Sequence, residues 1–334
     1  MARLTLVRVE ELLERIRSVH AVVAGDLMVD RYVTGVVDRV SPEAPVPVVR
    51  VEEERTAIGG AGNVAANIAA LGAGCSVIGC VGDDADGNAL CAAFAERGID
   101  IAGLVVTPKR PTTVKTRVMA RHQQIVRFDR EVEEDVPDAV AATLAESIRV
   151  ATRNADAVVL EDYNKGVLTG PVIRAAIDAA VERGVPSVVD PKRRNFFAFS
   201  GVTVLKPNAR ELQDALGDFI HPDRPSWMSR IRKRLECEHL LLTLGERGMV
   251  LYGEGTGLVR VPTAARAMYD VSGAGDTVTA VVSAALAAGG SPIEAAKIAS
   301  HAAAVEVGKT GVATVTPEEI LDHIEAHPHD METS

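Results

Sequence analysis

A stretch near the C-terminal end of the chain combines an acid with small residues in a pattern suited to phosphate chemistry. It reads Tyr-Asp-Val-Ser-Gly-Ala-Gly-Asp-Thr over residues 269–277 and continues into an apolar, Ala-rich segment at 278–288. Apolar residues recur there at helical spacing, so Gly273, Ala274 and Gly275 are predicted to form the turn that starts a helix. The first N–H groups of a helix have no partner within it and lie at the positive end of its dipole, so this turn could hold a phosphate.

Asp276 gives this turn a second chemical feature. A carboxylate fixed beside a bound phosphate can take the proton from a hydroxyl group that attacks the phosphorus, which is the arrangement of a phosphotransferase. The alternative is an acid that only stabilises the helix start, by about 0.3–1 kcal/mol. The stretch by itself leaves both interpretations open.

The composition limits the class of protein. With 334 residues and 47% hydrophobic content, the chain can bury one large core or two small ones. No apolar run approaches the roughly 20 residues that span a bilayer, so we expect a cytoplasmic protein. A net charge of −10 and an aromatic content of 3% argue against nucleic acid as a partner. The cysteines lack the spacing of a metal site and are predicted to be buried thiols.

Short apolar segments alternate with helical patterns along the chain. Buried strands are predicted at 21–24, 75–81, 157–160, 187–189 and 240–244. Helices are predicted at 62–72, 85–97, 136–152 and 170–183. This alternation predicts a three-layer α/β/α fold with a mostly parallel central sheet, in which ligands bind beyond the carboxyl ends of the strands. Acids stand at several of those ends, namely Asp26, Glu161, Asp162 and Asp190.

Two segments lack the helical pattern. Residues 31–56 and 112–129 have a β-rich, extended character, and the prolines of the first suit an edge strand. We expect both segments to leave the main body and to form a small antiparallel sheet that acts as a lid. No composition shift divides the chain, so residues 1–330 are predicted to be one domain, with 327–334 as a frayed tail.

A second glycine-rich stretch, Gly-Gly-Ala-Gly-Asn-Val-Ala at 59–65, formally fits part of a dinucleotide-binding fingerprint. The fingerprint requires a buried strand before it, whereas the preceding residues 51–58 carry several charges. A dinucleotide-dependent oxidoreductase is therefore only a remote alternative. The Walker sequence of P-loop kinases does not occur either, so a kinase with this sequence needs another fold.

The two glycine-rich stretches together, at 59–65 and 270–276, resemble the paired signatures of the ribokinase-like (PfkB-type) carbohydrate kinase family. The likeness covers about residues 20 to 320. It is greatest to the family members that phosphorylate D-glycero-D-manno-heptose 7-phosphate. That closer likeness is carried by residues 25–32, 41–49, 121–127, 162–166, 190–192 and 307–311.

The resemblance implies an ATP-dependent kinase that transfers the γ-phosphoryl group to O1 of the heptose 7-phosphate, for the synthesis of nucleotide-activated heptose. ATP and Mg²⁺ are the implied cofactors, with a monovalent cation as a further candidate, and a homodimer through the β lid is expected. The alternatives are a kinase for another sugar or sugar phosphate and a catalytically silent sugar-binding protein. The His-x-Gly-His motif of a nucleotidyltransferase domain does not occur, so we expect a kinase only.

The resemblance also implies roles for individual residues. The catalytic groups are Asp276 as the base and the N–H groups of Gly273, Ala274 and Gly275 as the anion hole. Asn208 and Glu211 place Mg²⁺ on the nucleotide, although an Asn followed three residues later by Glu is also close to a helix-capping box. The remaining nucleotide contacts are Thr243, Gly245, Glu246 and Gly248. The sugar contacts are Asp26, Asp30, Gly59, Gly60 and Asn63.

A dianionic 7-phosphate far from O1 requires positively charged donors. Lys115, Arg117 and Arg121 are spaced to lie on one face of a lid strand, because strand side chains repeat every two residues. Edge strands also carry such charges only to stay soluble and unpaired, which is the alternative. On the heptose interpretation, Arg117 and Lys165 are the expected contacts, with Lys115 and Arg121 as second choices.

Two positions depart from the family pattern. Ser272 stands where Thr is usual, and it keeps the hydroxyl group. His301 stands where Asn is usual near the adenine, and a buried structural histidine is the preferred interpretation.

Overall fold

The computed structural model describes residues 4–121, 123–265, 272–309 and 311–327. Within these residues the main sheet has the strand order β14-β13-β12-β11-β10-β9-β1-β4. Its parallel part comprises β4 (Gly74–Ile78), β1 (His20–Gly25), β9 (Ala157–Glu161), β10 (Ser187–Asp190), β11 (Val204–Leu205) and β12 (His239–Thr243). The antiparallel edge comprises β13 (Met249–Gly253) and β14 (Gly257–Val261).

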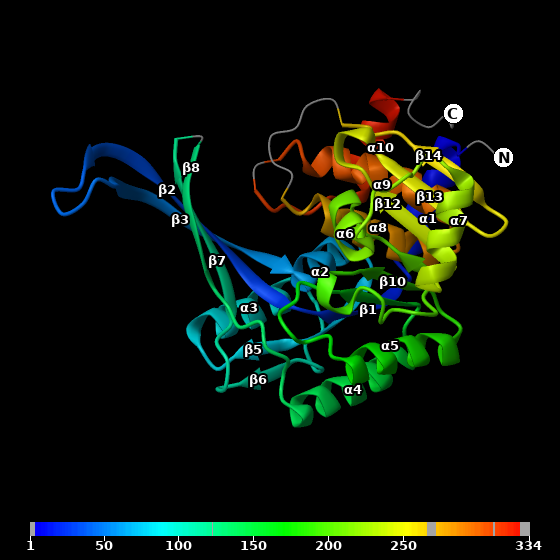
Figure 1. The fold of residues 1–334 in the computed structure, drawn as a ribbon, viewed down its shortest axis with the longest axis horizontal. Coiled ribbons are helices and arrows are strands. Elements are labelled where there is room, and N and C mark those ends of the chain that lie inside the picture. Colours follow the sequence, from blue (N-terminus) through cyan, green and yellow to red (C-terminus); the bar gives the residue numbers. More distant parts are fainter. Residues whose placement is uncertain (1–3, 122, 266–271, 310, 328–334) are drawn as a thin grey trace.

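Helices cover both faces of this sheet (Figure 1). One core contains α1 (Leu6–Ile16), α2 (Ala61–Ala70), α3 (Ala85–Glu96), α8 (Ala274–Ala287), α9 (Pro292–Glu306) and α10 (Pro317–Ala326). The other contains α4 (Asp138–Thr152), α5 (Gly170–Arg183), α6 (Ala209–Leu216) and α7 (Pro225–Leu235). The short elements are β5 (Cys80–Gly82) and β6 (Val105–Thr107), which pair with each other, and the 3-10 turns η1 (Arg193–Asn195) and η2 (Gly245–Arg247).

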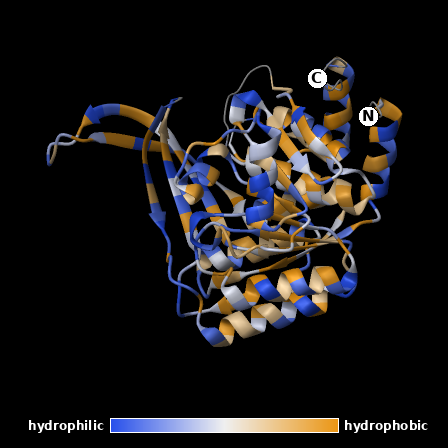
Figure 2. Ribbon diagram, turned by 45° about the vertical axis from the view of Figure 1, so that its right-hand side comes forward, coloured by the Kyte–Doolittle hydropathy of each residue, from blue (hydrophilic) through white to orange (hydrophobic). Residues whose placement is uncertain are grey.

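The side chains of β1 alternate between these two hydrophobic cores. Ala21 and Val23 pack in the core of α2 and α8, whereas Val22 and Ala24 pack in the core of α4 and α5. Because helices cover both faces, positions 21–24 of the strand are all apolar, which explains the continuous apolar pattern in the sequence. Figure 2 shows the mixture of hydrophobic and hydrophilic residues along the outer helices, which face the sheet on one side and solvent on the other.

The lid is a second sheet that projects from the body (Figure 1). Its strands are β3 (Pro47–Gly60), β2 (Leu27–Val40), β7 (Thr113–Ala120) and β8 (Gln123–Arg130), in that order. They include most of the two segments predicted to form it. The prediction of a purely antiparallel sheet is wrong, because β2 and β7 pair in parallel. Each hairpin is antiparallel, but both leave the body in the same direction, so the strands that meet between the hairpins run parallel.

The predicted three-layer α/β/α fold with a mostly parallel sheet is confirmed. The predicted strand at 75–81 is divided into β4 and β5, and β11, β13 and β14 are absent from the predicted set. Cys75, Cys80 and Cys237 are buried as predicted, whereas Cys91 is partly exposed. Among the described residues, no helix is long and apolar enough to cross a membrane. Most of the predicted tail, 328–334, lies outside the described residues.

Candidate active site

Asp276 lies in the first turn of α8, and only 5% of its surface is exposed. Gly273 precedes the helix at φ 97°, a left-handed conformation that favours glycine, and turns the chain into the helix. No side chain of the described residues caps this helix start, so its N–H groups can bind an anion. The first part of the motif, 269–271, lies outside the described residues.

Two side chains from other elements bind the Asp276 carboxylate. Asn63 of α2 donates from Nδ2 to Oδ2 at 2.8 Å, and Tyr163 donates from its hydroxyl group to Oδ1 at 2.6 Å. Burial raises the pKa of Asp276 to about 6, although both bonds act to lower it. A pKa in this range suits a general base that must be ionised near neutral pH and still accept a proton.

The ends of neighbouring strands bring further charged groups to this edge of the sheet. Asp190, at the end of β10, lies 2.9 Å from Nζ of Lys192 and 2.8 Å from Nζ of Lys206. Burial alone raises the pKa of Asp190, but the two lysines outweigh it and lower the pKa. Glu161, at the end of β9, is fully buried, and its carboxylate oxygens have no hydrogen-bond partner among the described residues. Burial and the nearby Asp190 raise the pKa of Glu161 well above its usual value.

Asn208 and Glu211 form a complete capping box at the start of α6. Oδ1 of Asn208 accepts the N–H of Glu211, and Oε2 of Glu211 accepts the N–H of Asn208, both at 2.8 Å. Oε1 of Glu211 lies 2.7 Å from Nζ of Lys192, which also contacts Asp190. The capping alternative is therefore realised, while the second oxygen of Glu211 faces the charged groups of the site.

Asn208 and Glu211 could bind Mg²⁺ only together with ligands from outside the protein. No group of three or more His, Cys, Asp or Glu in the described part of the chain could hold a metal ion. Mg²⁺ in kinases usually needs one or two protein ligands, because water and nucleotide phosphates supply the rest. Asn208 and Glu211 are two adjacent hard oxygen donors and meet that requirement.

A cavity of about 290 Å³ lies against the start of α8. Its lining includes residues predicted to contact the nucleotide or the anion: Asn208, Thr243, Gly245, Gly248, Ala274 and Gly275. Ala303, Ala304 and Val307 add an apolar wall. Glu246 is exposed in η2 and does not line the cavity. His301 is buried, and its Nδ1 lies 3.0 Å from Nδ1 of His323, so it contacts α10 as a structural residue would.

The residues predicted to contact the sugar lie where the lid joins the body. Gly59 and Gly60 end β3 immediately before α2, which carries Asn63. A side chain at Gly59 would collide with the Asp30 carboxylate and the Met28 side chain, so any larger residue would force them to move. Asp30 forms an ion pair with Arg117 across the lid.

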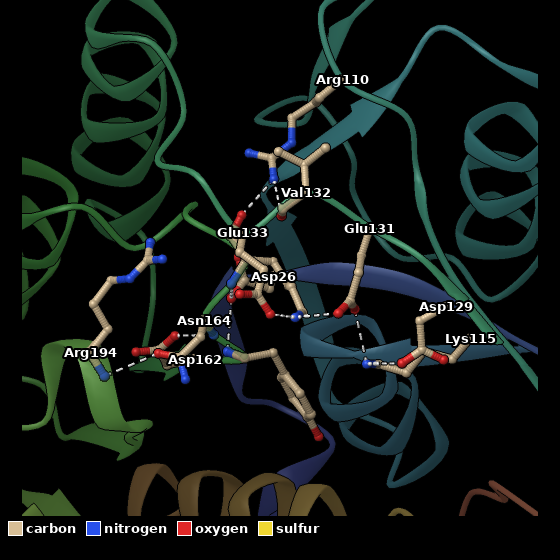
Figure 3. Close-up of polar contacts among 12 residues, drawn as sticks. Asp26, Arg110, Lys115, Asp129, Glu131, Val132, Glu133, Asp162, Asn164 and Arg194 are labelled. Atoms are coloured by element: carbon tan, nitrogen blue, oxygen red, sulfur yellow. Dashed lines mark hydrogen bonds and ion pairs between the residues drawn. The ribbon is translucent and has the colours of Figure 1, made fainter. Parts of the chain in front are cut away.

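Asp26, predicted as a further sugar contact, binds the backbone instead (Figure 3). Its buried carboxylate accepts the N–H groups of Tyr163 at 2.8 Å, Lys165 at 3.0 Å and Val167 at 3.1 Å. Asp26 therefore holds the loop that follows β9 and leaves little of its carboxylate for a ligand.

Lys115 of β7 and Lys165 of the body belong to one network of acids at the base of the lid, most of which is labelled in Figure 3. Nζ of Lys165 lies 2.8 Å from Glu131 and 2.9 Å from Glu133. Nζ of Lys115 lies 3.2 Å from Glu131 and 3.5 Å from Asp129. A phosphate bound by either lysine would have to compete with these carboxylates.

The predicted alternation of basic residues along the second lid segment is only partly correct. Lys115 and Arg117 share a face of β7, but β7 ends at Ala120. Arg121 lies in the hairpin turn with φ 55°, where the alternation of a strand has ended. Its predicted place beside Arg117 is therefore wrong.

Tyr163, Lys192 and Lys206 are site residues that the sequence analysis does not assign. Tyr163 and Lys192 belong to stretches that carried the family resemblance, and Lys206 precedes Asn208 by two positions. The resemblance marked the stretches at 162–166 and 190–192, but it gave no role to Tyr163 or Lys192. The contact of Tyr163 with Asp276 joins residues 113 positions apart, which no local spacing predicts.

Comparison with known proteins gives an independent view of this site. The sequence model of the pfkB family carbohydrate kinases matches residues 19–319. The bifunctional protein HldE of Pelobacter propionicus is 44% identical over 319 residues, which are 95% of this chain and 65% of that protein. HldE of Geobacter sulfurreducens is 42% identical over 315 residues, which are 94% of this chain and 64% of that protein. The chain thus spans slightly less than two thirds of these relatives.

Solved structures share the fold at lower sequence identity. Ribokinase of Arabidopsis thaliana, complexed with ribose and ATP, is similar with a TM-score of 0.72 and 21% identity, over 92% of this chain and 99% of that one. Phosphofructokinase-2 of Escherichia coli, in complex with potassium, is similar with a TM-score of 0.75 and 18% identity, over 92% and 98%. The family match covers the whole site described above. The chain belongs to the pfkB family of carbohydrate kinases.

Proposed function

We propose that the protein phosphorylates O1 of D-glycero-D-manno-heptose 7-phosphate and forms the 1,7-bisphosphate, a precursor of nucleotide-activated heptose. In this reaction Asp276 accepts the O1 proton while O1 bonds to the γ-phosphorus of ATP and ADP leaves. The N–H groups of Gly273, Ala274 and Gly275 stabilise the negative charge of the transferred phosphoryl group.

The nucleotide occupies the cavity beside α8. Thr243, Gly245 and Gly248 contact it there, with Glu246 in the adjoining turn. Asn208 and Glu211 would hold Mg²⁺, and the bound ion would reduce the charge of the nucleotide phosphates. A monovalent cation is a further candidate cofactor. A cytoplasmic location is part of the proposal, since ATP is supplied there.

A group of side chains on the lid selects a phosphorylated sugar as the substrate. Arg55, Tyr32 and Arg117 are register partners on β3, β2 and β7, so their side chains share one face of the lid. The guanidinium carbon of Arg55 lies 4.2 Å from the centroid of the Tyr32 ring, and that of Arg117 lies 5.5 Å from it. The same face carries Asp30, two residues from Tyr32 along β2.

This group lies on the part of the lid that approaches the anion turn. The Tyr32 hydroxyl accepts the N–H of Val312 at 3.3 Å, and Val312 lies beside Gly273. Two guanidinium groups held over one ring offer the planar, charge-assisted donors that a phosphate monoester prefers. Arg117 is therefore the first proposed contact of the 7-phosphate, Arg55 joins it, and Lys165 contacts it from the body.

The substrate proposal is tested by turnover of a panel of sugars and sugar phosphates with Mg-ATP. Heptose 7-phosphate should be the best substrate, and the unphosphorylated heptose should have a kcat/KM lower by roughly 10²-fold or more. Phosphorus NMR of the product should place the new phosphate on O1. Equal turnover of the unphosphorylated heptose, or phosphorylation of another oxygen, would overturn the proposal.

We also propose that two copies associate through the outer face of the lid. Val126 and Phe128 of β8 lie on the face opposite Tyr32 and are 48% and 57% exposed. Val51, at 53%, belongs to the same sheet. Exposed apolar residues gathered on one sheet suit a protein partner. Sedimentation should show a dimer that Phe128→Glu converts to a monomer, and a wild-type monomer would rule this interface out.

A further inference from the structure

The loop that follows β9 is fixed from several sides (Figure 3). Asp26 binds three of its N–H groups, and Arg110 donates to the carbonyl oxygen of Lys165 at 2.6 Å. Oδ1 of Asn164 accepts the N–H of Arg194 at 3.2 Å. A loop held by so many bonds gives the side chains it carries little freedom.

Tyr163 is the side chain that this loop directs toward the catalytic base. Its hydroxyl group lies 2.6 Å from Oδ1 of Asp276, a length typical of a charge-assisted hydrogen bond. Nζ of Lys192 lies 5.2 Å from the centroid of the Tyr163 ring. Burial and the neighbouring Asp276 raise the pKa of Tyr163 well above its usual value, so the phenol stays protonated and remains a donor.

We propose that Tyr163 is a positioning residue, whose phenol orients the Asp276 carboxylate and keeps it ionised for proton transfer. The inference rests on the proposed role of Asp276 as the base and not on the identity of the sugar. In the step, the O1 proton passes to Asp276, O1 bonds to the γ-phosphorus, and the electron pair of the broken P–O bond leaves with ADP. Tyr163 and Asn63 each take one acceptor position of a carboxylate that offers about four, so O1–H can still donate to it.

The surroundings of Asp276 explain why it needs such donors. The charged groups near it are Asp190 and Lys192 after β10, Glu161 of β9, Lys206 after β11 and, beside Gly273, Glu306 of α9. Burial and Asp190 raise the pKa of Asp276, whereas the bonds from Tyr163 and Asn63 and the charge of Lys206 lower it. Loss of the phenol hydroxyl should therefore raise that pKa and favour the protonated, inactive form.

The experiment compares wild type, Tyr163→Phe and, as a matched control, Tyr252→Phe on β13. The titration of Asp276 is followed by carbon NMR of labelled aspartate in the free protein, with Asp276→Asn to assign the signal. The kcat/KM is measured against pH with Mg-ATP and heptose 7-phosphate, or with the best sugar of the panel if that compound is not turned over. Tyr163→Phe should move both the titration and the acidic limb to higher pH by about one unit, and Tyr252→Phe should move neither.

The two measurements separate this inference from the choice of substrate. A shifted titration with no turnover of heptose 7-phosphate would refute that substrate and leave the role of Tyr163 standing. An unshifted titration, or an equal loss of kcat/KM at every pH with a lower Tm, would overturn the inference. If Tyr163→Phe does not fold, 3-fluorotyrosine at position 163 serves instead: its phenol is a stronger donor and should move the limb to lower pH.

Discussion

The charged groups around Asp276 and those of the lid are arranged in opposite ways. At the strand ends, Asp190 and Lys206 have side-chain exposures of 7% and 3% and pair within the body. In the lid, the Arg127 side chain is 50% exposed and pairs with Asp129 of its own strand. Buried pairs keep their geometry and are costly to break, whereas exposed pairs contribute little and rearrange readily. The body thus provides fixed chemistry, whereas the exposed part of the lid can rearrange. The Arg117–Asp30 pair of the lid, with side-chain exposures of 16% and 7%, resembles the buried pairs of the body.

The largest effect on activity is expected when Asp276, the proposed base in the buried site, is replaced. Asp276→Asn should lower kcat by about 10²–10⁴, because proton acceptance from O1 is lost. Binding of Mg-ATP, measured by calorimetry, should stay close to wild type, since the N–H groups of the turn remain. A loss of less than tenfold would place the base elsewhere.

On the lid, the expected effect depends on the phosphate of the substrate. Arg117→Ala should lower kcat/KM for heptose 7-phosphate by roughly 10²-fold, because remote binding energy positions O1 for attack. Arg55→Ala and Lys165→Ala should act in the same direction. Unphosphorylated heptose should be equally poor for wild type and variants, and Arg50→Ala at the exposed end of the hairpin is the control. Values within threefold of wild type for both Arg117→Ala and Lys165→Ala would contradict the assignment.

Low pH should reduce the catalytic activity by protonating Asp276. Burial raises the pKa of Asp276 from 3.8 to about 6, so kcat/KM should fall about tenfold per unit below roughly pH 6. The sign for stability is opposite: a raised folded-state pKa favours the protonated form, so this contribution is present at low pH and is lost as the pH rises through about 6. Tm measured from pH 4 to 7 should therefore change differently in Asp276→Asn. An acidic limb below pH 4.5 would disagree with this account.

The smallest effect is expected for a substitution at Glu211, which caps α6 beside the proposed nucleotide site. Glu211→Gln keeps an oxygen for the N–H of Asn208 but loses the charge that faces Lys192. The free energy of unfolding should change by about 1 kcal/mol or less, while kcat falls and the Mg²⁺ requirement rises. Glu294→Gln, in the equivalent capping box of α9, is the matched control. Unchanged Mg²⁺ dependence with clear destabilisation would show that Glu211 serves the cap alone.

The sequence predicts the parts of the site that depend on local order. The turn at Gly273 and the acid at 276 follow from small residues before a helical repeat, and Asp190 follows from its place after a buried strand. The contact of Tyr163 with Asp276 could not be predicted, because it depends on the conformation of the loop after β9, which Asp26 holds from a distant part of the chain. The pairing of Lys206 with Asp190 likewise depends on the register of β10 and β11.

The strand pairing of the lid is also hard to predict from the sequence, because it depends on contacts between distant segments. The β-rich composition of the lid is a local property, and both segments were predictable from it. The parallel pairing of β2 with β7 is set by the directions in which two distant hairpins leave the body. The position at which β7 ends decides whether Arg121 joins Arg117, and that depends on the hairpin turn.

The junction between lid and body has a mechanical consequence. Asp26 alone separates β1 from β2, and β3 ends at Gly60, directly before the first residue of α2. The β2–β3 hairpin of the lid is therefore joined to the body with almost no intervening loop. Any rotation of the lid about this junction displaces the carboxylate that anchors the loop of Tyr163. The angle of the lid and the alignment of the catalytic carboxylate are thus not independent degrees of freedom.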